Sequence, residues 1–160
     1  MAIDGYYYLH ENGELIYRRA LPGIEADFRE SSLVRAFWPC DPEDRETAWT
    51  TLVEALAAGA NKSRVAELAA KWHCTDEDAK VFAQRVGCIV RHEDPSPNPK
   101  GPIYATRADF VNIQESPNGW GDTALEAMAE LAKELGYKPA KMWGHTFKSL
   151  LAAPAAKAVR

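Results

Sequence analysis

The hydrophobic period of the chain changes at Cys88 from that of a helix to that of a strand, and this change limits the fold. Before it, from Asp41 to Gly87, apolar residues recur every three or four positions, which is the spacing of an amphipathic helix. After it, the segment CIVRH introduces a period of two, which is typical of a strand. Because helices and strands occupy separate stretches, the sequence predicts an α+β fold.

The clearest local signal is residues 5–19, GYYYLHENGELIYRR, which predict a β-hairpin. Asn12-Gly13 is a favoured pair for a two-residue type I′ turn, because both positions need positive φ. That turn places His10 opposite Leu15, and a longer turn is the alternative. Either face of such a hairpin is partly apolar, so we expect it to join a larger sheet. The second apolar face can be covered by the chain's own helices or by a second copy of the chain, and the latter would make a homodimer.

Three helices are expected between the hairpin and the later strands. The first begins with Asp41 as N-cap and a proline after it, and it ends at Gly59. The third is capped by Thr75 and ended by Gly87. The predicted helices span about 41–59, 62–72 and 76–86. We predict that 41–87 forms a helical lobe inserted between the hairpin and the C-terminal part of one domain, residues 1–160.

The C-terminal part is expected to contain further strands and two helices. Thr123 and Glu126 have the spacing of a capping box at the start of an amphipathic helix. The predicted strands are 88–92, 103–107 and 109–116, with a mobile proline-rich loop at 93–102, a turn at 116–123, and helices at 123–135 and 145–153. We expect the hairpin and these strands to form an antiparallel sheet, with the C-terminal helices packed on it.

Composition argues against several classes of function. The 160 residues carry a net charge of −4, which disfavours non-specific binding to nucleic acid. No apolar run approaches the roughly 20 residues that span a bilayer, so no membrane partner is expected. The first residues, MAIDGYYYLHENGE, lack the basic and apolar parts of a signal peptide, and the chain has three cysteines. We therefore expect a cytoplasmic protein.

The segment VAELAAKWHCTDEDAKVF, residues 65–82, resembles a helix-turn-helix in its apolar spacing. A DNA-binding unit of this kind places the first residues of its second helix against the bases and phosphates. Here those residues are Asp76, Glu77 and Asp78, which phosphate would repel and which stabilise a helix N-terminus. The alternative function is therefore a DNA-binding regulator built on a helix-turn-helix-like unit at 62–87. Its candidate DNA-binding residues are Lys62, Arg64 and Lys71.

No motif for catalysis or for a cofactor is recognisable. The chain lacks a G-x-S-x-G elbow, a phosphate-binding glycine loop and a C-x₂-C pair. The nearest approach to a zinc ligand set is His73, Cys74, Cys88 and His92. Cys74 and Cys88 lie at opposite ends of the third predicted helix, about 20 Å apart, so they cannot hold one ion. We predict no catalytic residue, no metal and no cofactor.

Aromatic residues next to turns are the candidates for protein binding. Trp120 lies in the short segment SPNGWGDT, and Trp38 directly precedes a predicted helix. Tryptophan and tyrosine are enriched at interface hot spots, so Trp120, Trp38, Tyr7 and Tyr8 are the candidate contact residues. The alternative is that each ring folds back over the sheet. The leading hypothesis is a non-enzymatic accessory protein that binds an unknown protein and so modulates a host process.

Two resemblances accompany this hypothesis. Residues 103–135, with Gly121-Asp122-Thr123 and Glu126-Ala127 after predicted strands, resemble the sheet-to-helix segment of HicB-type antitoxins. That resemblance implies a degraded RNase H-like α+β fold and a partner toxin. The whole chain, above all 5–19 and DFVNIQESPNGWGDT, is similar to uncharacterised small proteins of proteobacterial phages and prophages. This implies a cytoplasmic accessory protein, in the host cytoplasm if a phage encodes it, that binds a host or phage macromolecule.

Overall fold

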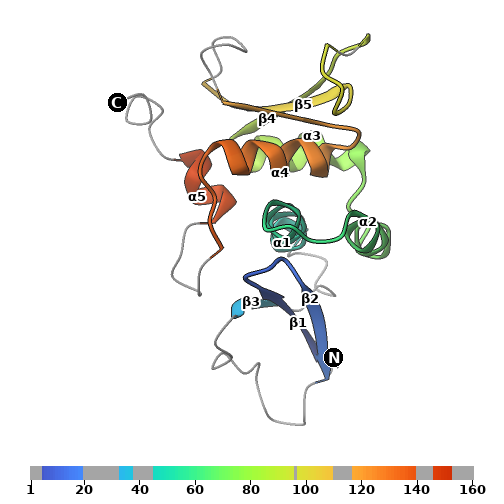
Figure 1. Cartoon of the computed structure of the whole chain (residues 1–160), viewed down its shortest axis with the longest axis vertical. Coiled ribbons are helices and arrows are strands. Elements are labelled where there is room, and N and C mark those ends of the chain that lie inside the picture. Colours follow the sequence, from blue (N-terminus) through green and yellow to red (C-terminus); the bar gives the residue numbers. More distant parts are fainter. Residues whose placement is uncertain are drawn as a thin grey trace.

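The computed structural model describes residues 5–19, 33–37, 45–95, 97–109, 117–139 and 146–152. They form an α+β fold, as predicted, but the hairpin and the later strands form two antiparallel sheets instead of one, because helices lie between them (Figure 1). The elements are β1 (Gly5–His10), β2 (Leu15–Arg19), β3 (Leu33–Phe37), α1 (Arg45–Ala57), α2 (Lys62–Lys71), α3 (Asp76–Val86), β4 (Cys88–His92), β5 (Ile103–Arg107), β6 (Asn118–Gly121), α4 (Ala124–Glu134) and α5 (Phe147–Ala152).

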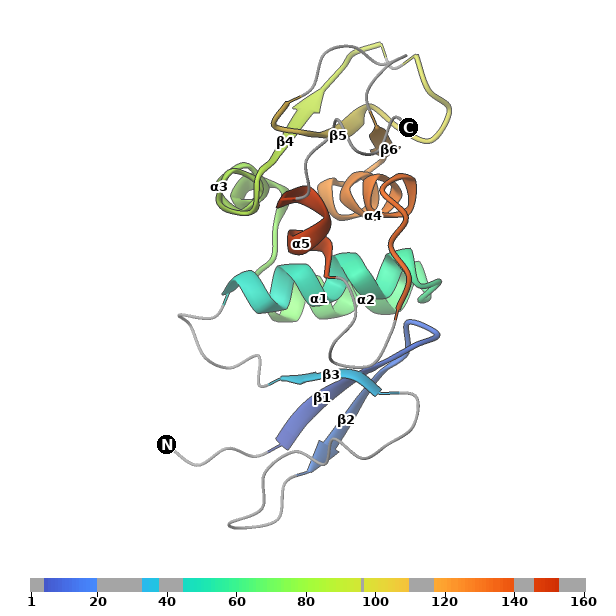
Figure 2. The same ribbon diagram turned by 90° about the vertical axis from the view of Figure 1, so that its left-hand side faces the viewer.

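The elements stack in layers. The hairpin sheet, in the order β2-β1-β3, lies below α1 and α2, while the C-terminal sheet, in the order β4-β5-β6, lies beyond α3 and α4 (Figures 1 and 2). One cluster of buried side chains runs through the layers from Tyr7 to Leu151. The predicted helical lobe at 41–87 therefore shares its core with both sheets. No described helix is long and apolar enough to cross a membrane.

The hairpin adopts the longer turn. Leu9 lies opposite Leu15, one position away from the register of a two-residue turn. The His10 amide donates to the carbonyl of Glu14 at 2.9 Å, and Gly13 has a φ of 88°. Gly13 packs so closely on α1 that an added Cβ would lie 2.6 Å from the Ala55 carbonyl oxygen. This register gathers Tyr7, Leu9 and Leu15 on the face that joins the core.

The second and third helices do not pack as a compact pair. α3 begins and ends where the sequence predicts, with Thr75 as N-cap and Gly87 in the left-handed conformation. It packs against β4, α4 and α5, while α2 packs against α1. The rings of Trp49 and Phe82 stack 5.1 Å apart and join α3 to α1. The main contacts of α2 and α3 are thus with other elements, and the helix-turn-helix-like arrangement at 62–87 stays a prediction.

The predictions for the turn at 116–123, the loop at 93–102 and two segments outside the described residues remain to be compared with the structure. Residues 118–121 form the strand β6, where the sequence predicts a turn, because their backbone completes the ladder of β5. In the loop 93–102, the Gly101 amide donates to the carbonyl of Asn98, and the Glu93 amide donates to that of Pro102. The predicted strand at 109–116 and helix start at 41–44 lie outside the described residues, apart from Asp109.

Candidate binding groove

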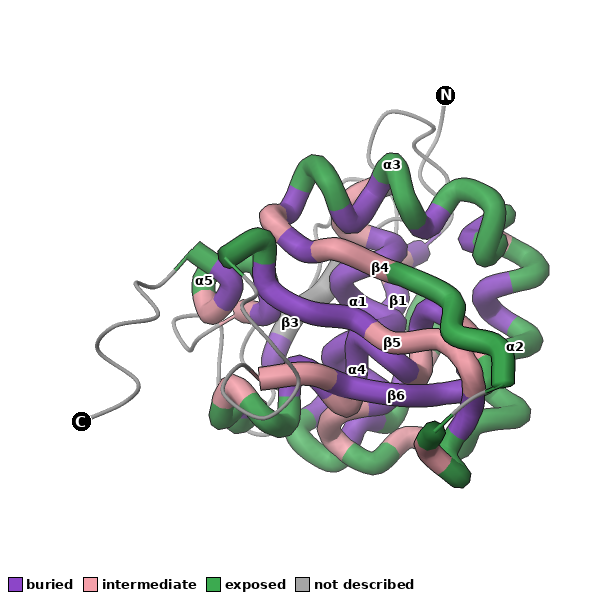
Figure 3. Tube along the Cα trace, turned by 90° about the horizontal axis from the view of Figure 1, so that it is seen from above, coloured by how far each residue is buried: buried purple, intermediate pink, exposed green. Residues whose placement is uncertain are grey.

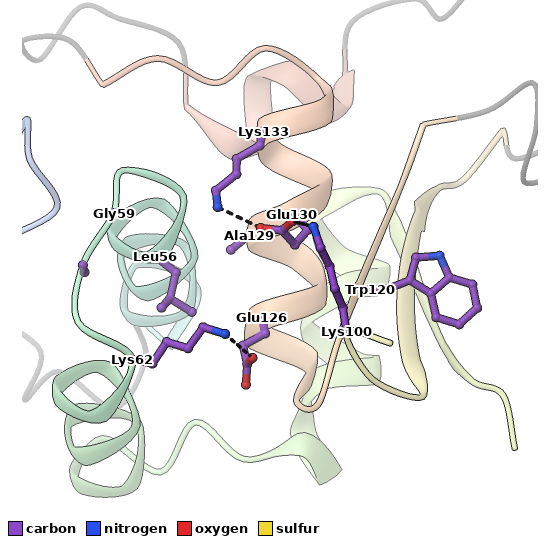
Figure 4. A pocket seen from close by; sticks show the side chains of 10 residues that line it. Leu56, Gly59, Lys62, Lys100, Trp120, Glu126, Ala129, Glu130 and Lys133 are labelled. Carbon is purple, nitrogen blue, oxygen red and sulfur yellow. Dashed lines mark hydrogen bonds and ion pairs between the residues drawn. The ribbon is translucent and has the colours of Figure 1, made fainter. Parts of the chain in front are cut away.

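Three adjoining hollows surround the turn that joins α1 to α2. The first, of about 370 Å³, lies between this turn and α4 (Figure 4). The second, of about 280 Å³, lies between α2 and the start of α4 and shares Leu56, Lys62 and Glu126 with the first. The third, of about 260 Å³, lies between the hairpin tip and α2 and shares Gly59 and Ala60 with the first. We call the first two hollows the groove.

One half of the groove is charged. Lys62 bonds to Glu126 at 3.2 Å, and Glu130 accepts from both Lys100 and Lys133. The glutamate side chains are only 21% and 25% exposed, whereas the lysine side chains are 51–77% exposed. The carboxylates therefore form the floor, and the ammonium groups stand at the rim (Figure 4).

Burial and hydrogen bonds act in opposite directions on the Glu130 carboxyl. Partial burial raises its pKa, but the hydrogen bonds from Lys100 and Lys133 outweigh this effect, and the pKa lies below its ordinary value. The same hydrogen bond raises the pKa of the Lys100 ammonium. Glu130 and Lys100 are thus both charged at neutral pH. In this half of the groove, three lysines pair with two glutamates.

The other half of the groove is apolar and lined by small side chains. Its walls come from one face of α2 and from the first turn of α4. The apolar lining residues are Leu56, Val65, Ala66, Ala69, Ala70, Cys74 and Leu125. Alanine side chains allow a second backbone to approach closely. The groove therefore combines an apolar half, bordered by Asp76, with a charged half whose most exposed groups are lysines.

Capping interactions hold α4 in place beside the groove. The Thr123 side chain accepts from the Glu126 amide at 3.2 Å, as the predicted capping box requires. Asp76, at the start of α3, accepts from the Ala124 amide at 3.0 Å. The acidic residues of α3 therefore include one that caps a second helix, a structural role that needs no nucleic acid or basic partner.

The aromatic residues predicted as contacts are buried where they are described. Trp120 is 5% exposed and stacks on Tyr104 with ring centroids 4.7 Å apart, and its indole donates to Asn118. Its ring points away from α4, on the other side of β6 (Figure 4). Tyr7 and Tyr8 are 6% and 3% exposed. The structure agrees with the alternative in which the rings fold inward: Tyr104 covers Trp120, and Tyr17 and Trp72 pack against Tyr7. Trp38 lies outside the described residues, and a role of these aromatic residues in protein binding stays a prediction.

The candidate DNA-binding residues do not share a surface. Lys62 is held by Glu126, while Lys71 donates to the Tyr7 hydroxyl at 3.2 Å. Arg64 lies 4.0 Å from Glu67. At 100° per residue, Lys62 projects from the opposite side of α2 to Arg64 and Lys71. A basic stripe along α2 is thus absent from the described residues.

In the charged half, sequence reasoning indicated Lys62 and Glu126 for other roles and missed Lys100, Glu130 and Lys133. Lys133 follows Glu130 by three positions, a spacing that predicts a helical ion pair. No local pattern predicts Lys100, because the loop 93–102 brings it to α4 across 30 positions of sequence. Figure 3 shows this loop as an exposed extension of the C-terminal sheet.

Cys74 and Cys88 are structural cysteines. Both are buried, and burial raises the pKa of the Cys88 thiol to about 12. No group of three metal-binding side chains occurs among the described residues.

In a Cys40→Ser background, we expect neither Cys74 nor Cys88 of the folded protein to react with a disulfide reagent at pH 8. Both thiols are buried, and Cys88 has on the order of a thousandfold less thiolate than an ordinary cysteine. Denaturant should expose both, and rapid labelling of the native protein would contradict the burial.

No family model, no curated protein and no solved structure matches this chain. The similarity to HicB-type antitoxins and to phage proteins therefore stays a prediction, and the groove has to be interpreted from its own geometry.

Proposed function

We propose that the chain is a non-enzymatic accessory protein that binds a segment of a partner protein in the groove. The observation that carries this proposal is the continuity of the apolar half with the basic rim across Lys62 and Glu126. An apolar hollow lined by alanines suits the side chains of an amphipathic segment. The groove follows α4 from Thr123 to Lys133, so a short polypeptide segment can contact both halves.

The rim favours an acidic partner. Lys62, Lys100 and Lys133 are exposed, and each can turn its ammonium group from a glutamate toward a carboxylate of the partner. A basic partner would have to approach the glutamates behind these lysines. We therefore expect a segment with apolar residues at one end and Asp or Glu at the other, held by burial and oriented by charge.

The alternative, a DNA-binding regulator at 62–87, has less support. Lys62 lies on the opposite side of α2 from Arg64 and Lys71, and α3 packs against the C-terminal sheet. Duplex DNA binding that rises at low salt and is lost on reversing Lys62, Arg64 and Lys71 would favour it over the groove.

Selection from a random-peptide library on the immobilised chain tests the proposal. We expect enriched peptides to combine apolar and acidic residues. Ala66→Trp fills the apolar half from an exposed position and should weaken binding of such a peptide at least about tenfold, whereas Ser63→Trp, exposed on α2 but outside the groove, should leave it unchanged. Binding that both variants leave intact, or catalytic turnover of the ligand, would overturn the proposal.

A further inference from the structure

β2 forms one edge of the hairpin sheet. It pairs with β1 on one side, and among the described residues no strand lies on its other side. Tyr17, Arg18 and Arg19 are exposed, and Tyr17 is 46% exposed. An open edge of this kind offers unpaired backbone groups to another strand. The edge is separate from the groove, so pairing along it does not depend on the proposed function.

The hairpin fixes which backbone groups point outward. The hydrogen bond from the His10 amide to Glu14 makes these two a hydrogen-bonded pair of the ladder. Such pairs alternate along an antiparallel ladder. Ile16 and Arg18 therefore direct their backbone groups toward β1, and Leu15 and Tyr17 direct theirs toward the open edge.

The edge is complementary to itself. We propose that β2 pairs antiparallel with β2 of a second copy about a two-fold axis at Ile16. In this register Leu15 of one copy lies opposite Tyr17 of the other, and both have outward backbone groups that can exchange hydrogen bonds. Glu14 then lies opposite Arg18 of the second copy, and the symmetry repeats this ion pair. The two hairpin sheets become one continuous sheet.

The charges of Glu14 and Arg18 favour pairing with β2 of a second copy over pairing with an unrelated strand. Glu14 and Arg18 lie at opposite ends of the pairing segment, and their side chains share the face of the sheet that carries Tyr8, over whose ring the Arg18 guanidinium lies at 5.6 Å. A uniformly acidic strand would meet Glu14, and a uniformly basic strand would meet Arg18. Only a strand with the opposite charge at each end satisfies both, and β2 itself is one. Opposite charges across non-hydrogen-bonded pairs stabilise such a ladder because their side chains are close.

Sedimentation equilibrium over a range of concentrations tests this dimer. We expect the wild-type chain to dimerise reversibly. Glu14→Arg and Arg18→Glu each place like charges opposite one another, so each should weaken self-association about tenfold. An equimolar mixture of these two variants pairs opposite charges again, and it should form heterodimers with about the wild-type affinity.

Arg19→Glu is the matched control. It makes the same charge change at the neighbouring exposed residue, which lies opposite Gly13 in the proposed register, and it should not alter self-association. Circular dichroism of all variants establishes that they are folded. A wild-type chain that stays monomeric would overturn the proposal, as would a dimer that neither single reversal weakens or a mixture that forms no heterodimer.

Discussion

Glu54→Ala is expected to lower the free energy of unfolding by about 4 kcal/mol, which corresponds to a fall in Tm of about 10 °C or more. Glu54 is fully buried in α1. One carboxylate oxygen accepts from the Tyr137 hydroxyl and the other from the Phe147 amide, each at 3.1 Å. The substitution leaves both donors buried without this acceptor and adds a cavity. Thermal and urea unfolding followed by circular dichroism measures the loss.

Two variants separate hydrogen bonding from volume. Glu54→Gln keeps the shape but places an NH₂ group against one of the two donors, and it should cost about 1–3 kcal/mol. Glu46→Ala removes a glutamate of the same helix whose ion pair with Lys148 is more exposed, and it should cost under about 1 kcal/mol. Equal losses for Glu54→Ala and Glu46→Ala would show that the buried carboxylate does not hold α5 to α1.

These contacts mark the limit of what the sequence predicts. The ends of α3 and the cap of α4 follow from neighbouring residues such as Thr75, Gly87 and Thr123, because capping is local chemistry. The bond from Glu54 to Phe147 joins residues 93 positions apart, and no local pattern indicates it. Glu54 lies on the side of α1 away from the apolar stripe, so from the sequence it looks like a surface residue, although the structure buries it.

The hairpin shows a second kind of limit. Asn12-Gly13 predicts a turn, and a turn is present, but the same dipeptide is compatible with two loop lengths. The choice is made by packing, because the longer loop puts Leu15 beside Leu9 on the core face and places Gly13 against α1. A shift of one residue would send Leu15 to the other face. Register is therefore decided by the helices that the hairpin covers.

The candidate site likewise contains residues that the sequence indicates and contacts that no local sequence pattern predicts. The sequence indicates Lys62, but as a DNA contact; the structure pairs it with Glu126 on α4. Trp120 is a candidate from the sequence because a short turn cannot cover a large ring. The segment is a strand instead, and its register with β5 brings Tyr104 against the indole. Burial of an aromatic ring thus depends on strand pairing that no local window contains.

Gly119→Ala is expected to destabilise the protein by about 3 kcal/mol or more. Gly119 lies in β6 against α4, and an added Cβ would overlap the carbonyl oxygen of Ala127 and the amide nitrogen of Leu131. Both are backbone atoms of a helix, so neither can turn aside as a side chain would. The strand must move from α4 or the helix must bend, and either shift disturbs the helix whose opposite side lines the groove.

Gly136→Ala is the matched control, because it tests backbone conformation without crowding. Gly136 has a φ of 85°, and nothing lies within 4 Å of an added Cβ, so the cost should be about 1–2 kcal/mol from the left-handed conformation alone. Urea unfolding of both variants compares them, with peptide binding as a second readout. Gly119→Ala should lose both stability and groove affinity, while Gly136→Ala should keep its affinity. If Gly119→Ala costs no more than Gly136→Ala, the contact between β6 and α4 is looser than the structure shows, and the wall of the groove is not fixed by the C-terminal sheet.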